Sequence, residues 1–137
     1  MSINIFIDTN IFMNSIEDRD SWLSKAILLF LKQIDVDSYL NDLSVMNIYY
    51  LTRKSTHRDK IKDALKVILS EQNIVSIDGD IIENALNSDF KDFEDAVQYF
   101  CAKKIWADLI LTDNIKDFVG SDIMVMTAQE FAESYMN

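Results

Sequence analysis

Acidic side chains stand where apolar segments of this sequence stop. Ile3–Ile7 runs directly into Asp8, and Leu109–Leu111 is followed by Asp113 and Asp117. A buried strand fixes the backbone, so an acid just beyond its end projects from the edge of the sheet. Several such carboxylates, far apart in sequence, are most simply explained by convergence in space. Converged carboxylates repel one another unless a cation lies among them, so the pattern predicts a hard metal, Mg²⁺ or Mn²⁺, bound through oxygen.

A third group of acids, Asp92, Glu94 and Asp95, opens a helical segment, where the helix dipole favours anions. Carboxylate-held Mg²⁺ suits phosphodiester hydrolysis, because it lowers the pKa of its bound water and neutralises charge on the phosphoryl oxygens. Asp8 and Asp95 are the primary candidate ligands. Both residues also have a structural alternative, as the cap or first-turn residue of a helix.

The apolar periodicities predict strands that alternate with helices. Strands are expected at residues 3–7, 38–40, 73–77, 109–111 and 123–126. Helices are expected at residues 20–34, 45–53 with Ser44 as N-cap, 58–69, 79–86, 92–104 and 128–135. Such alternation predicts an α/β fold with a mainly parallel sheet flanked by helices on both faces.

Composition limits the classes of protein that this chain can be. Its 137 residues, 49% of them hydrophobic, suit one compact domain spanning 1–137. No apolar stretch approaches the ~20 residues of a membrane span, so we expect a soluble, cytoplasmic protein. Cys101 is the only cysteine, which excludes an internal disulfide and a Cys-based zinc site. With two glycines there is no Gly-rich phosphate loop.

The distribution of charge is uneven. A formal net charge of −10 opposes binding to a polyanion. Residues 53–66, however, contain six Lys or Arg against two Asp, whereas residues 78–95 contain seven acids and one Lys. The basic stretch either binds a phosphate backbone or is an ordinary solvated helix face, and the sequence leaves both interpretations open.

The sequence resembles the PIN-domain nucleases, the fold shared by VapC-type toxins and several RNA-processing nucleases. The likeness lies in four segments in order: Ile5-Phe6-Ile7-Asp8-Thr9-Asn10, residues 44–54, Asp95-Ala96 with the apolar helix after it, and residues 111–118. It implies a three-layer α/β fold. It also implies that the catalytic and metal-binding residues are Asp8, Asp95, Asn114 and Asp117. Thr9, Asn10 and Thr112 have the chemistry to hold a ligand carboxylate or the scissile phosphate.

Two positions depart from the family pattern. Many PIN nucleases have Glu where this chain has Asn47, which either reaches the metal or makes a capping contact with Ser44. The fourth site falls on Asn114, with Asp113 beside it as a further candidate. An amide oxygen attracts Mg²⁺ less than a carboxylate does. Additional acids that could compensate are Glu94, Asp92 and Asp117.

The resemblance implies a metal-dependent endoribonuclease, the toxin of a toxin–antitoxin system, with RNA as substrate and an antitoxin as partner. A homodimer is a further expectation, because PIN-like toxins commonly pair as dimers and the first half contains the aromatic residues Trp22, Phe30, Tyr49 and Tyr50. The alternative is a PIN-like module that binds RNA or protein with weak or no catalysis, supported by Asn47 and the negative charge. A structure-selective DNA nuclease is a weaker alternative, since the long insertions of such enzymes are missing.

Overall fold

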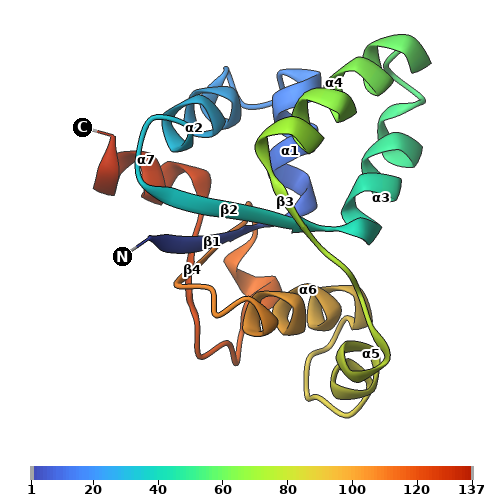
Figure 1. The fold of residues 1–137 in the computed structure, drawn as a ribbon, viewed down its shortest axis with the longest axis vertical. Coiled ribbons are helices and arrows are strands. Elements are labelled where there is room, and N and C mark those ends of the chain that lie inside the picture. The colour runs from blue at the N-terminus through green and yellow to red at the C-terminus, as the bar shows by residue number, and fades with distance from the viewer. Residues whose placement is uncertain (1, 137) are drawn as a thin grey trace.

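Five parallel strands form the centre of the molecule in the order β3-β2-β1-β4-β5 (Figure 1). The computed structural model describes residues 2–136. Its strands are β1 (Ile3–Ile7), β2 (Val36–Asn41), β3 (Asn73–Val75), β4 (Leu109–Leu111) and β5 (Met124–Met126). The strand order reverses between β1 and β4, so the loops that leave these two strands diverge. In open parallel sheets this switch point, at the carboxyl ends of the strands, is where ligands bind.

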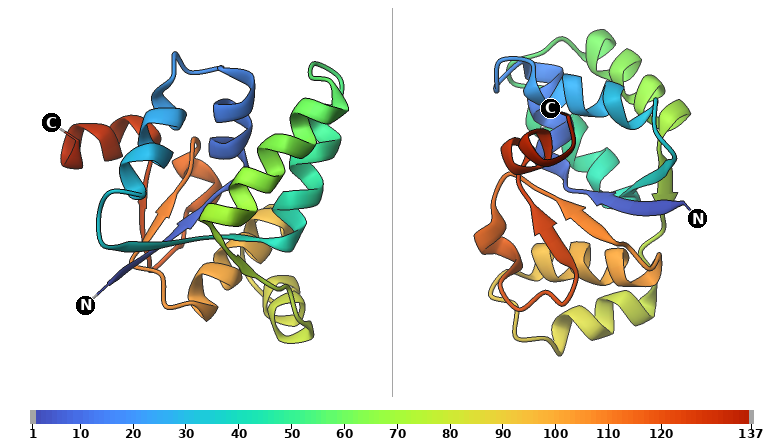
Figure 2. Two further views of the ribbon diagram at one scale, coloured as in Figure 1. Left: turned by 45° about the horizontal axis from the view of Figure 1, so that its top comes forward. Right: turned by 90° about the vertical axis from the view of Figure 1, so that its left-hand side faces the viewer.

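Helices cover both faces of the sheet, as Figure 2 shows. They are α1 (Thr9–Glu17), α2 (Leu23–Leu31), α3 (Asp42–Thr52), α4 (Arg58–Glu71), α5 (Gly79–Leu86), α6 (Phe93–Lys104), α7 (Ala128–Tyr135) and the 3-10 helix η1 (Ile115–Phe118). Ile5 and Ile7 of β1 pack with helices α1, α2, α3, α4 and α7, whereas Phe6 packs with α5 and α6 on the other face. Two apolar cores therefore sandwich the sheet, which confirms the predicted three-layer α/β architecture.

Helix α1 was not predicted. Its sequence contains two asparagines, a serine and two β-branched isoleucines, all weaker helix formers than Ala or Leu. Burial of Ile11, Phe12 and Ile16 against the sheet stabilises it instead. In α6, helical periodicity predicts one apolar stripe of Phe93, Val97, Phe100 and Cys101, which is partly wrong because Phe93 is 49% exposed.

The predicted boundaries hold elsewhere to within a few residues, with β2 longer and α2 shorter than expected. None of the helices between residues 2 and 136 has both the length and the apolar composition of a transmembrane span.

Candidate active site

Asp8 lies directly after β1, at the carboxyl end of the middle strand. Its backbone N–H donates to the carbonyl oxygen of Leu111 at 2.9 Å, which ties it to β4. The residue is 6% exposed. Its Oδ1 accepts from the Thr9 N–H and its Oδ2 from the Thr112 hydroxyl, both at 2.8 Å. Asp8 is thus the N-cap of α1 and, at the same time, a carboxylate whose orientation two neighbouring elements fix.

Burial raises the pKa of Asp8 to about 6, although the hydrogen bonds from Thr112 and Thr9 hold it lower than burial alone would. The negative charges of Asp117 and Glu94 raise the pKa further. Since such repulsion decays with distance, these carboxylates share one region of the molecule. The structure therefore brings together acids from β1, α6 and η1.

Asp95 lies in the first turn of α6, where Asp92 is the N-cap and accepts from the Asp95 N–H at 3.0 Å. Partial burial raises the pKa of Asp95 to about 7, with further rises from the charges of Asp117, Asp92, Asp8 and Glu94. Asp8 and Asp95 each feel the other's charge, although 87 residues separate them in sequence. We refer to Asp8, Glu94, Asp95 and Asp117 as the acidic site.

The acidic site suits a hard cation by the chemistry of its donors. Every side-chain donor in it is a carboxylate oxygen, the ligand type that Mg²⁺ and Mn²⁺ prefer. Among residues 2–136, no three Asp, Glu, His or Cys side chains lie close enough in this structure to hold one ion together. They are close enough to raise one another's pKa, and a bound cation would remove that repulsion.

The loop after β4 arranges the remaining candidates. Asn114 is the N-cap of η1: its Oδ1 accepts from the Lys116 N–H at 3.2 Å, and its amide donates to Asp117 Oδ1 at 3.1 Å. The carboxylate of Asp113 accepts from the Asn14 side chain on α1. Asn114 thus contacts the acidic site by its hydrogen bond to Asp117, whereas Asp113 is hydrogen-bonded to α1. Asn10 is exposed in the first turn of α1.

Residues 4–116 match the family model described as "PIN domain". The chain belongs to the PIN-domain family. It is 28% identical to "Ribonuclease VapC1" of Aquifex aeolicus over 142 residues, with 98% of this chain and 96% of that protein covered.

Solved structures share the fold at lower identity. The structure of VapBC2 from Rickettsia felis, bound to a DNA fragment from its promoter, has a TM-score of 0.69 at 16% identity and covers 91% of this chain and 98% of its own. Mycobacterium tuberculosis VapC20, described as a sarcin–ricin loop cleaving toxin, has a TM-score of 0.68 at 14% identity, with 85% and 94% covered. A toxin–antitoxin complex from Klebsiella pneumoniae has a TM-score of 0.68 at 24% identity, with 90% and 97% covered.

In this PIN domain, Asn47 stands where many PIN nucleases have an acid, and it hydrogen-bonds to a different acid, Glu94. Its side-chain amide donates to Glu94 Oε1 at 2.8 Å. The predicted capping contact with Ser44 is wrong, because the N-cap of α3 is Asn41, whose Oδ1 accepts from the Ser44 N–H at 2.8 Å. Asn47 therefore joins α3 to the start of α6 at the rim of the acidic site.

A buried polar network beneath the acidic site was missed by sequence reasoning. Gln98 of α6 is 1% exposed, and its Nε2 donates to Thr9 Oγ1 at 3.3 Å and to Ser44 Oγ at 3.2 Å. Its Oε1 accepts from the Asn41 amide at 3.0 Å, and the two hydroxyls lie 2.6 Å apart. The network ties together the first turns of α1 and α3 and the helix that carries Asp95. A glutamine among the apolar residues of α6 was the available signal.

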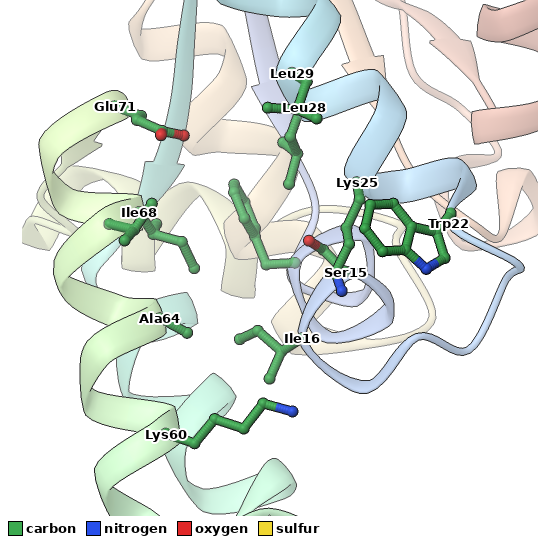
Figure 3. Close-up of a pocket in the computed structure, with 12 residues that line it drawn as sticks. Ser15, Ile16, Trp22, Lys25, Leu28, Leu29, Lys60, Ala64, Ile68 and Glu71 are labelled. Carbon is green, nitrogen blue, oxygen red and sulfur yellow. The ribbon is translucent and has the colours of Figure 1, made fainter.

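A separate apolar groove lies between α1, α2 and α4 of the PIN domain (Figure 3). It has a volume of about 330 Å³. Its walls are formed by Phe12, Ile16, Leu28, Leu29, Ala64, Val67 and Ile68, with Trp22, Lys25, Lys60 and Glu71 among the other lining residues. Trp22, Leu29 and Val67 are all more than half exposed, so the groove offers an apolar surface to a partner.

Proposed function

We propose that this PIN domain is a divalent-metal-dependent endoribonuclease, the toxin of a toxin–antitoxin pair that acts in the cytoplasm. The observation that carries the proposal is the acidic site at the switch point of the sheet, built from three separate segments. The similarity to a ribonuclease over 98% of the chain supports the same activity. RNA is therefore the proposed substrate.

Asp8 and Asp95 are the proposed primary ligands of Mg²⁺ or Mn²⁺, with Asp117 and Asn114 contributing directly or through water. A bound ion supplies two things: a water of lowered pKa, and positive charge against the phosphoryl oxygens. Asp8 and Asp95 have raised pKa values of about 6 and about 7, so protons compete with a cation for both. We therefore expect metal affinity to rise with pH across this range.

The neighbouring polar groups act by orientation. The Thr112 hydroxyl and the Thr9 N–H each donate a hydrogen bond to one oxygen of Asp8. The carboxylate is thereby fixed, and its remaining lone pairs are available to the cation. Thr9 is itself held by Gln98 and Ser44. Asn10, exposed beside Thr9, is the proposed contact for the scissile phosphate. The chain thus positions its carboxylates before substrate arrives, as catalysis at a charged centre requires.

Glu94 is the proposed replacement for the acid that many PIN nucleases carry at the position of Asn47. The Asn47 amide holds Glu94 at the rim of the acidic site, and the charge of Glu94 already raises the pKa of both Asp8 and Asp95. In this arrangement α6 supplies the second negative charge and α3 supplies its hydrogen bond. Asp92 is less suited, because it caps α6.

An antitoxin is the proposed partner, and the groove of Figure 3 is its proposed docking site. One solved structure with this fold is described as a toxin–antitoxin complex, from Klebsiella pneumoniae, and another as DNA-bound VapBC from Salmonella typhimurium. An apolar helix of the antitoxin would fill the groove, while basic groups beyond it would be attracted to the acidic site. Self-association through exposed aromatic side chains remains a prediction, and light scattering at high concentration tests it.

A binding module without catalysis is the second candidate, favoured by Asn47 and by the net charge of −10. The two candidates are separated by incubating pure protein with a panel of structured RNAs in Mg²⁺, in Mn²⁺ and in EDTA. Cleavage that requires the metal supports the nuclease. RNA or antitoxin binding with no cleavage in either metal supports the module.

A further inference from the structure

The outer face of α3 leads from the acidic site to the most basic part of the chain. Asn47 and Tyr50 are three residues apart in α3, so they lie on one face of it, and Arg53 and Lys54 follow directly after its end. Asn47 contacts Glu94 at one end, and Tyr50, midway, is 51% exposed. The Arg53 guanidinium lies 4.9 Å from the centre of the Tyr50 ring. In Figure 1, α3 runs from the end of β2 to the turn that joins it to α4.

That turn and the start of α4, residues 53–62, form what we call the basic turn. It contains five Lys or Arg and one acid, Asp59, in a chain of net charge −10. Most cations elsewhere are neutralised: Lys32 pairs with Glu71, Lys103 with Asp122 and Lys104 with Asp78. Within residues 2–136, Arg53, Lys54, Lys60 and Lys62 make no such ion pair. Arg58 approaches only its exposed neighbour Asp59, at 3.8 Å, against 2.8–2.9 Å in the three pairs above.

We propose that Tyr50 and the basic turn form a binding track for single-stranded RNA, with a base stacked on Tyr50 and phosphates against Arg53, Lys54 and Arg58. The inference rests on the proposed ribonuclease function and names the surface that holds its substrate. The acidic site repels phosphates, so a protein of this charge needs its RNA affinity from another surface. Cations without a close ion pair provide it by releasing counterions, and an exposed ring provides a platform for an unstacked base.

The spacing fits one strand that reaches both regions. From Asn47 to the end of α3 at Thr52 the helix rises by about 8 Å, a distance that a short extended stretch of RNA covers. Base-paired RNA has no free base to stack on Tyr50, which favours single strands, loops and bulges.

A second copy of the protein suits this face less well. The exposed apolar side chains along it are Met46, Tyr50 and Leu51, each roughly half exposed. In a symmetric dimer the cations of this face would meet the same cations of the second copy, and like charges repel. The cations beside them fit an anionic polymer.

The test is fluorescence anisotropy with a fluorescein-labelled oligouridine in EDTA, where binding is measured without metal-dependent cleavage. The triple variant Arg53→Gln, Lys54→Gln, Arg58→Gln should lower the slope of log affinity against log salt by about 2, the value for three lost phosphate contacts. The matched control removes three cations that are already paired: Lys32→Gln, Lys103→Gln, Lys104→Gln. It should leave the slope near that of the wild type.

Substitutions of Tyr50 test the stacking. Tyr50→Ala should weaken binding about tenfold, whereas Tyr50→Phe, which keeps the ring, should bind as the wild type does. Tyr135→Ala is the control, since Tyr135 is 53% exposed on α7, far from the basic turn in Figure 1. Circular dichroism confirms that each variant is folded.

Three results would overturn the track. The first is a triple variant with an unchanged salt slope. The second is a Tyr50→Ala variant that binds like Tyr135→Ala. The third is a wild-type dimer that Tyr50→Ala dissociates while RNA binding is unchanged, which would make this face an interface between copies. Cleavage of RNA by the wild type in Mg²⁺, measured separately, decides the proposed function whichever of these is found.

Discussion

Replacing Asp8 with Asn should make the metal-free protein more stable at neutral pH. The substitution keeps the shape of the side chain and removes its charge. Asp8 has a pKa of about 6 in the folded protein, against an ordinary value of 3.8. The folded state therefore prefers the protonated acid. The contribution of Asp8 to the stability of the wild type falls as pH rises from about 4 to about 6, and no further loss from this group is expected above that range.

The size of the effect follows from the pKa. The rise from 3.8 to about 6 corresponds to about 3 kcal/mol of penalty on the ionised form. Asn avoids that penalty but accepts less well from the Thr9 N–H and the Thr112 hydroxyl. Weakening those two hydrogen bonds costs about 1 kcal/mol each. The expected net gain is on the order of 1 kcal/mol at neutral pH, with little or no gain near pH 4.

The assay is urea unfolding in EDTA at several pH values, with Asp122→Asn as control. Asp122 is exposed and its pKa is lowered by the Lys103 ammonium, so its charge favours the folded state once it is ionised. Asp122→Asn should thus change stability in the opposite direction as pH rises. If Asp8→Asn instead loses several kcal/mol at neutral pH, Asp8 serves mainly as the cap of α1 and the repulsion argument fails.

Three further outcomes are expected. Asn47→Glu should tighten Mg²⁺ binding in calorimetry, because it adds a negative oxygen beside Glu94; if Asp8→Asn abolishes binding while Asn47→Glu leaves it unchanged, Asn47 lies outside the coordination sphere. Gln98→Leu should lower the melting temperature and also the metal affinity at a temperature where the variant is folded, since it releases Thr9 and the first turn of α3; unchanged metal affinity would limit Gln98 to a packing role. Val67→Asp should prevent co-purification of a protein partner from the native host while the melting temperature stays constant, and retained binding would move the antitoxin away from the groove of Figure 3.

The parts of the fold that could be predicted are those where one local pattern dominates. Ile3–Ile7 and Leu109–Leu111 are uninterrupted apolar runs, and both are buried central strands. Arg58–Glu71 has apolar residues at helical spacing over several turns. In such segments the apolar pattern is strong enough to indicate the type of element from periodicity alone.

The parts that were missed depend on contacts between distant segments. The predicted N-cap Ser44 was wrong: the cap of α3 is Asn41, and since either residue type suits that position, only the end of β2 decides. The partner of Asn47 is Glu94, which lies 47 residues away. Gln98 is a polar residue among the buried apolar residues of α6, and its role becomes clear only from its hydrogen bonds with Thr9, Ser44 and Asn41. Convergence of Asp8 and Asp95 could be predicted, whereas their raised pKa values required the structure.

The central claim is that the acidic site hydrolyses RNA with a bound cation. The most direct measurement is the single-turnover cleavage rate of a structured RNA in Mg²⁺ by the wild type, by Asp8→Asn and by the exposed-site control Asp122→Asn. We predict cleavage by the wild type and the control, loss of all cleavage in EDTA, and a rate lower by orders of magnitude for Asp8→Asn, which remains folded. Equal cleavage by the wild type and Asp8→Asn would contradict the claim, because the activity would then come from another nuclease.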